Sequence, residues 1–230
     1  MKSLSIIMPV LNEAEGIDDV LSALAPLRQR GAEVIVVDGG SRDATAKLAR
    51  PLADNVISAP RGRGAQMNAG AAVARGEVLL FLHADTRLPA GADTLILDGL
   101  RQSGAPWGRF DIRIEGGPFL RIVALTMNLR SRLTGIATGD QAMFVTRPAF
   151  QSAGGFPDIA LMEDVALSRS LKKLSSPLYL RVRVVTSGRR WQRQGLMRTI
   201  LLMWRLRLAY FLGARPAALA RRYGYVPREN

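Results

Sequence analysis

The sequence contains no cysteine and only one histidine, His83. The lack of cysteine excludes disulfide bonds, zinc sites built from thiolates and catalysis by a thiol nucleophile. It also fits a reducing compartment, so we expect a cytoplasmic protein. The first residues lack the long apolar core of a signal peptide and lead directly into strand-like sequence, which agrees with that expectation.

Acidic residues are almost absent from the last part of the chain. From residue 165 to the end there are fifteen Lys and Arg residues against one acid, Glu229, whereas the preceding 164 residues are close to neutral. This asymmetry indicates a polyanionic partner, either an anionic membrane surface or a nucleic acid, although a solvated basic face gives the same pattern. Aromatic side chains are scarce near the basic clusters, so we expect no nucleic-acid partner.

Before residue 90 the sequence alternates regularly between short apolar runs and segments of helical periodicity. This alternation predicts βαβ units, and therefore an α/β fold with a mostly parallel central sheet flanked by helices. Pro9 is expected to end the first strand. The predicted strands are residues 3–8, 33–37, 55–58 and 78–82, and the helices are residues 17–30, 43–50 and 64–75. Later in the chain, strands are predicted at residues 107–114, 141–146 and 178–185, and helices at 92–102, 119–133, 162–174 and 191–212.

Polar residues follow three of the predicted strands at the point where each strand ends. Pro9–Glu13 follows the first strand, Asp38–Ser41 follows the second, and Asp85 follows the strand at residues 78–82. Ligands of open α/β sheets bind outside the carboxyl ends of the strands, so we expect these residues to share one rim. A carboxylate at such a rim suits Mg²⁺ or Mn²⁺, which prefer oxygen ligands. For Asp85 taken alone, capping of the following segment is an equally good explanation.

Several motifs in a fixed order carry a family resemblance. They are SIIMPVLNE, VIVVDGGSRDAT and LLFLHADT, followed by GDQAMF, GGF and MEDV. Together they resemble the family 2 glycosyltransferases of the GT-A fold, from about Leu4 to the region of residues 189–191. The resemblance implies a hexosyltransferase that moves a sugar from a nucleotide diphosphate, UDP- or GDP-linked, to an acceptor hydroxyl with inversion. A nucleotide-binding, membrane-associated protein without transfer activity is the alternative.

The resemblance implies a nucleotide pocket formed by the segments that follow the first two strands. Its residues are Pro9, Asn12, Glu13, Asp38, Gly40 and Ser41. Among them, Asp38 is expected to contact the base. Arg190 and Trp191 fall where related enzymes place an arginine-tryptophan motif near the diphosphate. The glutamine that leads this motif in processive polymerases is missing, which favours transfer of a single sugar.

The segment RGRGAQMNAG at residues 61–70 is a second candidate for anion binding. Glycine N–H groups and arginine cations at the start of a helix suit a phosphate, so we add Arg61, Gln66 and Asn68 to the donor site. A basic loop before an ordinary helix is the competing explanation for Arg61. With FLHADT and GRRW, this segment resembles a bacterial subgroup of these transferases, some linked to arsenosugar biosynthesis.

The resemblance also assigns the metal ligand and the general base. Asp85 would hold Mn²⁺ or Mg²⁺ beside the donor diphosphate, and Asp164, next to Glu163, would take the proton of the acceptor hydroxyl. Capping of a helix is the simpler explanation for these last two acids. The usual Asp-x-Asp is replaced by His83-Ala84-Asp85. His83 could ligate Mn²⁺, donate a hydrogen bond to the donor, or be an ordinary residue at a strand end.

The domain expectation is a transferase domain at residues 1–190 and a basic, apolar helical extension at residues 191–230 packed on it. In that extension Arg198 and Arg205 share one helical face and Arg207 points roughly the opposite way. Three arginines in a membrane span of ~20 residues would each cost roughly 2.5–3.5 kcal/mol near its centre, so we expect no span. The extension would lie on the inner face of an anionic membrane, cover the core, or form a homodimer.

Overall fold

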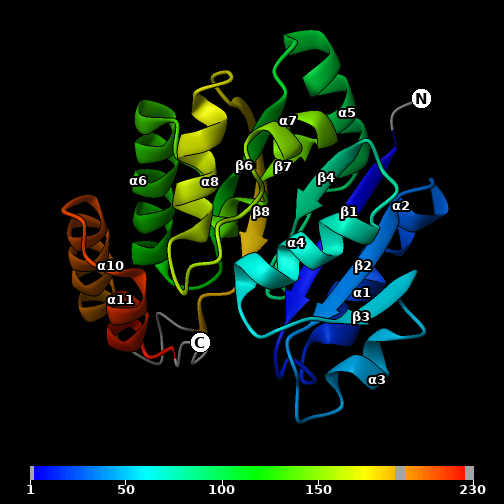
Figure 1. The fold of residues 1–230 in the computed structure, drawn as a ribbon, viewed down its shortest axis with the longest axis horizontal. Helices are drawn as coiled ribbons and strands as arrows, with labels where there is room; N and C mark the ends of the chain where they lie inside the picture. Colours follow the sequence, from blue (N-terminus) through cyan, green and yellow to red (C-terminus); the bar gives the residue numbers. More distant parts are fainter. Residues whose placement is uncertain (1–2, 190–194, 226–230) are drawn as a thin grey trace.

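The computed structural model describes residues 3–189 and 195–225, and it shows an eight-stranded sheet covered by helices (Figure 1). The strands are β1 Leu4–Val10, β2 Glu33–Asp38, β3 Asn55–Ser58, β4 Val78–Phe81, β5 Thr86–Arg87, β6 Trp107–Ile114, β7 Phe144–Thr146 and β8 Leu178–Thr186. The helices are α1 Ile17–Ala23, α2 Ala25–Gln29, α3 Thr45–Ala49, α4 Arg63–Val73, α5 Ala92–Ser103, α6 Pro118–Thr134, η1 Gly139–Gln141, α7 Arg147–Ser152, α8 Glu163–Lys172, α10 Leu196–Phe211 and α11 Pro216–Tyr223. The α/β prediction is confirmed.

The sheet has the order β3-β2-β1-β4-β7-β6-β8-β5. Its first four strands are parallel, as the alternation of strands and helices predicts. Beyond β4 the pairing is mixed, because β7 is antiparallel to both β4 and β6, whereas β6 and β8 are parallel. The segment from Trp107 to Ile114, which alternates like an antiparallel or edge strand, lies inside the sheet between β7 and β8. The carboxyl ends of β1, β2 and β4 therefore meet at one rim.

The first strand continues through Pro9 to Val10, so the expectation that Pro9 ends it is wrong. The N–H of Leu82 donates to the carbonyl of Ile7. The backbone N–H and C=O groups of the odd-numbered residues of β1 therefore point toward β4. Since β4 ends at Phe81, Pro9 lies beyond its neighbour and needs no N–H group on that side. The N–H of Gly39 donates to the carbonyl of Val10 at 3.0 Å and extends the pairing with β2.

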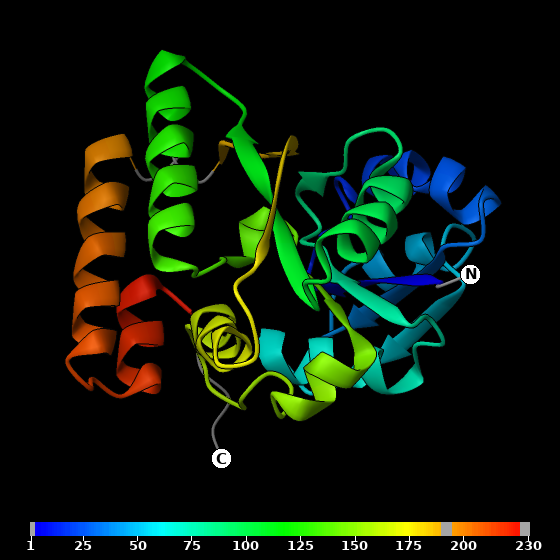
Figure 2. The ribbon, with the colours of Figure 1, turned by 90° about the horizontal axis from the view of Figure 1, so that it is seen from above.

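Two apolar clusters cover the two faces of the sheet. Ile6 and Met8 of β1 pack with α1, α2, α5 and α6, whereas Ile7 packs with α4, α7 and α8. Successive side chains of a strand point to opposite faces, so a strand buried on both faces has to be apolar throughout. Figure 2 shows α6 and α10 standing side by side at one end of the molecule.

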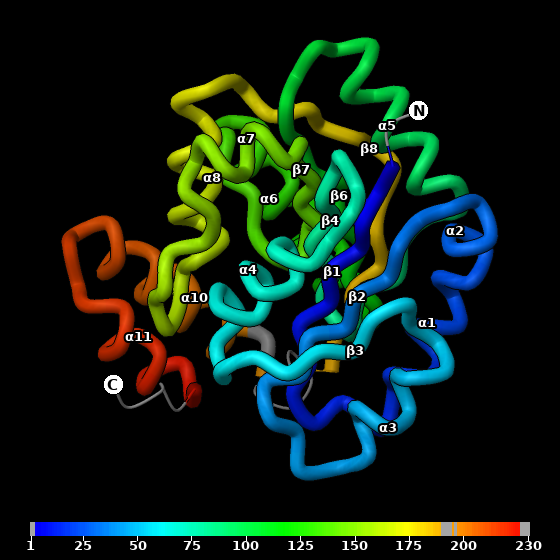
Figure 3. Tube along the Cα trace, turned by 45° about the vertical axis from the view of Figure 1, so that its right-hand side comes forward, coloured from blue at the N-terminus to red at the C-terminus, as the bar shows by residue number. Residues whose placement is uncertain are grey.

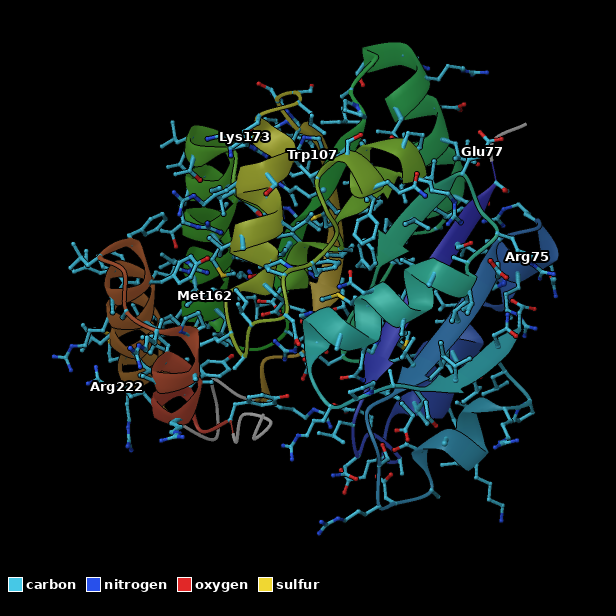
Figure 4. The ribbon with its side chains drawn as sticks, in the orientation of Figure 1. Arg75, Glu77, Trp107, Met162, Lys173 and Arg222 are labelled. Atoms are coloured by element: carbon cyan, nitrogen blue, oxygen red, sulfur yellow. The ribbon has the colours of Figure 1, made fainter. Side chains whose placement is uncertain are left out.

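The C-terminal helices α10 and α11 pack through a third, smaller cluster. Leu206 and Leu219 contact Ile136, Met162 and Val165, and the Met162 side chain is labelled beside α8 in Figure 4. In Figure 3 the two helices lie at the opposite end of the molecule from α3. None of the described helices is both long enough and apolar enough to cross a membrane.

Candidate functional site

A cavity of about 510 Å³ lies at the carboxyl ends of β1 and β4. The segments that line it come from the ends of β1 and β4, from η1, from the start of α8, and from α6 and α10. The polar side chains among its lining residues are Glu13, Arg63, Gln66, His83, Thr126, Asp85, Thr138, Asp140, Glu163, Asp164, Thr186, Ser187, Thr199, Arg207, Tyr223 and Tyr225. Acids that are far apart in the chain therefore converge on one space.

Glu13 and Asp85 face each other across the rim of the sheet. Burial and the negative charge of Asp85 raise the pKa of Glu13, and Arg189 and Arg63 oppose that rise. The carboxylate of Asp85 accepts a hydrogen bond from the Thr86 hydroxyl at 3.3 Å. Two carboxylates that repel each other in this way form a site that a divalent cation would stabilise.

The donor chemistry at this rim fits a hard cation such as Mg²⁺ or Mn²⁺, because carboxylate oxygens are available. Among the described residues, no three His, Cys, Asp or Glu side chains converge closely enough to hold a metal by themselves. A cation here would therefore need further oxygen ligands beyond these side chains. Asp85 remains the predicted ligand, with Glu13 beside it.

His83 contacts η1 through both ring nitrogens. Its Nδ1 lies 3.4 Å from Asp140 Oδ1. A methyl group built on Gly139 would lie 2.3 Å from Nε2, so the ring packs directly on the glycine backbone. Burial acts to raise the pKa of Asp140, but the contact with His83 and the charges of Arg63 and Arg207 hold it below its usual value. Ligation of a metal by His83 stays a prediction.

Glu163 and Asp164 begin α8 after Met162, whose φ of 72° is unusual for a non-glycine residue. Asp164 Oδ2 accepts the N–H of Gly139 at 2.8 Å, and Oδ1 accepts the N–H of Val165 at 2.7 Å. These bonds hold the carboxylate in the cavity wall. Glu163 is 5% exposed, and burial together with the charge of Asp164 raises its pKa to about 7. Glu163 therefore keeps its proton to a higher pH than an ordinary glutamate does.

Several residues expected in the nucleotide pocket, including Asp38, connect the segments that follow β1 and β2. The Asp38 carboxylate accepts the N–H groups of Gly40 at 3.3 Å and Ser41 at 3.1 Å. The Ser41 hydroxyl accepts the N–H of Asn12 at 2.9 Å, and Asn12 Oδ1 accepts the N–H of Arg42 at 2.8 Å. This network fixes one side of the rim, but none of these residues is among those that line the cavity in the described part of the chain.

Two polar residues of α4 hold other segments in place. Gln66 lines the cavity, and its Nε2 donates to the carbonyls of Val10 at 3.0 Å and Val37 at 2.8 Å. The Asn68 side chain pairs with the N–H and carbonyl of Phe156 at 3.0 and 2.8 Å, outside the cavity lining. Arg61 lies over the ring of Tyr225, 5.2 Å from its centroid.

Of the predicted site residues, Pro9, Glu13, Gln66, His83, Asp85, Glu163 and Asp164 line one cavity. Arg190 and Trp191 lie outside the described residues. The sequence assigned no role in the site to Asp140 or Arg207, which line the cavity as well, and considered Arg63 only as one of the two arginines of the anion-binding segment at residues 61–70. The helical spacing could have indicated Arg207, because it places this residue on roughly the opposite face from Arg198 and Arg205. In the structure those two arginines are exposed and Arg207 is half-buried.

Comparison with known proteins identifies the family. The family model "Glycosyl transferase family 2" matches residues 5–149 of the chain. Glycosyltransferase AglE of Haloferax volcanii is 37% identical over 90 residues, which cover 35% of this chain and 30% of AglE. Across the first matched curated relatives, the chain spans less than half of their length.

Several solved structures share the fold, among them two chains solved with nucleotide sugars. TarS 1–349 of S. aureus in complex with UDP-GlcNAc has a TM-score of 0.66 and 19% identity, covering 81% of this chain and 58% of TarS. The mannosyltransferase PcManGT of Pyrobaculum calidifontis, in complex with GDP-Man and Mn²⁺, has a TM-score of 0.63 and 23% identity, covering 97% of this chain and 65% of PcManGT. These likenesses confirm the GT-A fold, and the family match covers more than half of the chain. The chain therefore belongs to glycosyl transferase family 2.

Proposed function

We propose that this protein transfers a single sugar from a nucleotide diphosphate to an acceptor hydroxyl with inversion, assisted by a divalent cation. One observation carries the proposal: Asp85 and Asp164, which are far apart in the sequence, line the same cavity at the rim of the sheet. An acid for the cation and an acid for the acceptor proton are the two groups that this chemistry needs.

The donor would lie along the ends of β1 and β4, beside Pro9 and Glu13, with its diphosphate near Asp85. The likeness to TarS, solved with UDP-GlcNAc, and to PcManGT, solved with GDP-Man and Mn²⁺, supports a UDP- or GDP-linked sugar and Mn²⁺ or Mg²⁺. When bound, the cation would neutralise charge that develops on the leaving diphosphate. Arg63 adds a positive charge at the same cavity. Desolvation acts to lower its pKa, but the combined interactions with Glu163, Tyr223, Asp140 and Asp164 raise it.

Asp164 would act as the general base. Its carboxylate takes the proton of the acceptor hydroxyl as that oxygen attacks the anomeric carbon, while the bond from this carbon to the diphosphate oxygen breaks and the electron pair leaves with the diphosphate. Attack from the face opposite the leaving group inverts the anomeric configuration. The N–H groups of Gly139 and Val165 hold the carboxylate for this step. Glu163 would act as a positioning residue, since its raised pKa limits repulsion next to Asp164.

The division of the chain at residue 190 and its location also belong to this proposal. The transferase domain would comprise residues 1–190, and the extension at residues 191–230 would complete the cavity through α10. The outer faces of α6 and α10 expose apolar side chains next to basic ones, which fits peripheral contact with an anionic membrane at its cytoplasmic face. The link to arsenosugar biosynthesis stays a prediction.

Two variants test the roles of the acids. Asp164→Asn is expected to lower the transfer rate by about 10²–10⁴-fold, because it removes a general base, while UDP- or GDP-sugar still raises the melting temperature. Asp85→Asn is expected to abolish the part of that stabilisation that depends on Mn²⁺. Asp18→Asn, at an exposed acid of α1, is the matched control and should change neither readout. Full transfer activity in Asp164→Asn would disprove the assignment of the base.

A further inference from the structure

The wall of the cavity between α6 and α10 is apolar. Its apolar side chains are Ile122, Val123, Met127, Ile200, Met203 and Trp204. Figures 1 and 2 both show α6 and α10 side by side, with the strands of the sheet on the far side of α6. Ile122 is 57% exposed and Trp204 is 70% exposed, so this wall reaches from the cavity to the surface. A nucleotide and a cation do not require such a wall.

Two guanidinium groups have unused hydrogen-bond donors. Arg207 lines the cavity, and Arg130 is close enough to Arg207, Asp164 and Asp140 to interact with their charges. The Nε of Arg207, on α10, is buried and makes no hydrogen bond with any described residue. The same holds for Nε and Nη2 of Arg130, on α6, whose Nη1 donates to the carbonyl of Ile136 at 3.4 Å. Leaving a buried charged donor unpaired costs more free energy than leaving a neutral one unpaired. Such groups are expected to have a ligand.

The two arginines are close enough to influence each other. Burial and the positive charge of Arg207 lower the pKa of Arg130 to about 10, while Asp164 and Asp140 oppose this effect. No ion pair within 4.0 Å joins either arginine to an acid among the described residues. An oxyanion that accepts hydrogen bonds from both guanidinium groups would satisfy their donors and cancel their repulsion.

We propose that the sugar acceptor carries an anionic group, which Arg130 and Arg207 bind, and an apolar chain, which lies between α6 and α10. This inference rests on the proposed function, since it assigns the acceptor to the side of the cavity that Asp164 faces. The two arginines account for the anionic group of the acceptor, and the apolar wall accounts for its apolar chain. The shared chemistry is that of an alkyl phosphate, whether it comes from a lipid or from a soluble metabolite.

A ligand series on the unmodified protein tests both parts. The probes are n-octyl phosphate, inorganic phosphate and 1-octanol, with saturating UDP or GDP present to occupy the donor site. Trp204 lines the apolar wall, so its fluorescence reports binding, and the variant Trp204→Phe identifies its signal. We expect n-octyl phosphate to bind at least about tenfold more tightly than either fragment, since each fragment lacks one set of contacts. Equal affinity of 1-octanol and n-octyl phosphate would overturn the anion site.

Arginine variants then locate the anion. Arg207→Gln is expected to weaken n-octyl phosphate binding by about tenfold or more, because it removes a charge-assisted hydrogen bond. Arg205→Gln is the matched control, since Arg205 lies on the exposed side of the same helix. If Arg207→Gln does not fold, Arg130→Gln and the ligand series still test the anion site. Equal weakening by the Arg205 and Arg207 variants would show a diffuse surface effect and overturn the inference.

Failure of this inference and failure of the proposed function give different results. If UDP- or GDP-sugar stabilises the protein but n-octyl phosphate does not bind, the acceptor assignment is wrong and the proposed function stands. If n-octyl phosphate binds through Arg207 but no nucleotide sugar binds, the proposed function fails, and the assignment of this ligand as an acceptor fails with it. Competition between n-octyl phosphate and UDP for one site would also contradict a separate acceptor subsite.

Discussion

At the scale of single residues, the adjacent acids Glu163 and Asp164 differ because of what surrounds them. Both line the cavity, but Glu163 is only 5% exposed, and the carboxylate of Asp164 accepts two backbone hydrogen bonds. Burial favours the neutral form of an acid. Glu163 therefore keeps its proton to a higher pH than an ordinary glutamate, and it contributes to stability in a way that depends on pH.

The contribution of Glu163 to stability changes with pH in a definite direction. The pKa of Glu163 is about 7 in the folded protein against an ordinary value of 4.5. Between these values the folded state binds more protons than the unfolded state, so the contribution of Glu163 to stability falls as the pH rises. We predict that Glu163→Gln, which cannot ionise, gains stability relative to the parent protein from pH 5 to pH 8, on the order of 2 kcal/mol.

Urea denaturation at several pH values measures this difference. Glu77→Gln is the control, because Glu77 is an exposed glutamate, and its difference from the parent should stay constant with pH. A Glu163→Gln difference that is equally flat would show that Glu163 is ionised throughout this range.

Sequence reasoning singled out acids that line the cavity, but not their partners. Asp85 and Asp164 were predicted from a strand end and from motifs, because such positions are local in the chain. The pairing of His83 with Asp140 joins separate segments, so it depends on how η1 packs against the end of β4. The fully buried Arg109, which pairs with the buried Asp111, was also missed, since the alternation of β6 resembles that of a strand with one exposed face.

At the scale of elements, the close contact between α4 and the sheet depends on a glycine. A methyl group added at Gly70 would lie 2.4 Å from Ile7 Cγ2 and 3.0 Å from Val37 Cγ2. Both neighbours are fully buried and β-branched, so they have little freedom to move. α4 also carries Gln66 and Asn68, and its distance from the sheet therefore affects the rim.

We predict that Gly70→Ala destabilises the protein. Alanine in place of a helical glycine gains about 1 kcal/mol of helix propensity, but overpacking costs typically 1–3 kcal/mol. The short contact to Ile7 places this site at the upper end of that range, so a net loss of about 1–2 kcal/mol is expected. Thermal unfolding measures it, with Gly117→Ala as the control because no atom lies within 4 Å of the added methyl group. A higher melting temperature for Gly70→Ala would show that the helix moves away without cost.

Helices and strands were predicted correctly where the apolar periodicity of a short segment specifies them. The prediction failed where packing between distant segments determines the structure. The parallel half of the sheet followed from its regular alternation. The single helix predicted at residues 17–30 is divided into α1 and α2 at Leu24, because Pro26 begins a new helical turn. The short β5 and the order of β6, β7 and β8 depend on contacts between distant segments. Such contacts have no signature in a short window of sequence.

At the scale of the whole molecule, a small apolar cluster contributes to joining the C-terminal helices to the rest. Leu206 of α10 is 2% exposed and packs against Met162 and Ile136, next to the start of α8. We predict that Leu206→Ala lowers stability by about 2–5 kcal/mol, because it leaves a cavity in that cluster. Leu208→Ala, at a side chain that is 61% exposed, is the control and should change stability by less than about 0.5 kcal/mol.

Calorimetry on these variants also tests the proposed domain division. Since the cluster contains residues from both parts, we expect one unfolding transition in the parent protein. A separate, earlier transition in Leu206→Ala that leaves nucleotide binding intact would show that the extension unfolds independently.

The apolar outer faces of α6 and α10 lead to a prediction about membranes. Leu125 and Leu129 on α6 and Leu201 and Leu208 on α10 are all at least 50% exposed. With exposed arginines nearby, we predict sedimentation with phosphatidylglycerol vesicles that weakens as salt increases, and much weaker binding to neutral vesicles. Leu208→Ser should reduce the bound fraction, whereas Val73→Ser on α4 should not. Concentration-dependent dimerisation without vesicle binding would assign this face to a second copy of the chain.

The family match ends at residue 149, while Asp164 and α10 lie after it. If the donor is recognised mainly by segments before that point and the acceptor partly by a helix after it, the two substrates are encoded in different stretches of the gene. Exchanging α10 between relatives would then redirect which molecule is glycosylated while the choice of sugar stays the same.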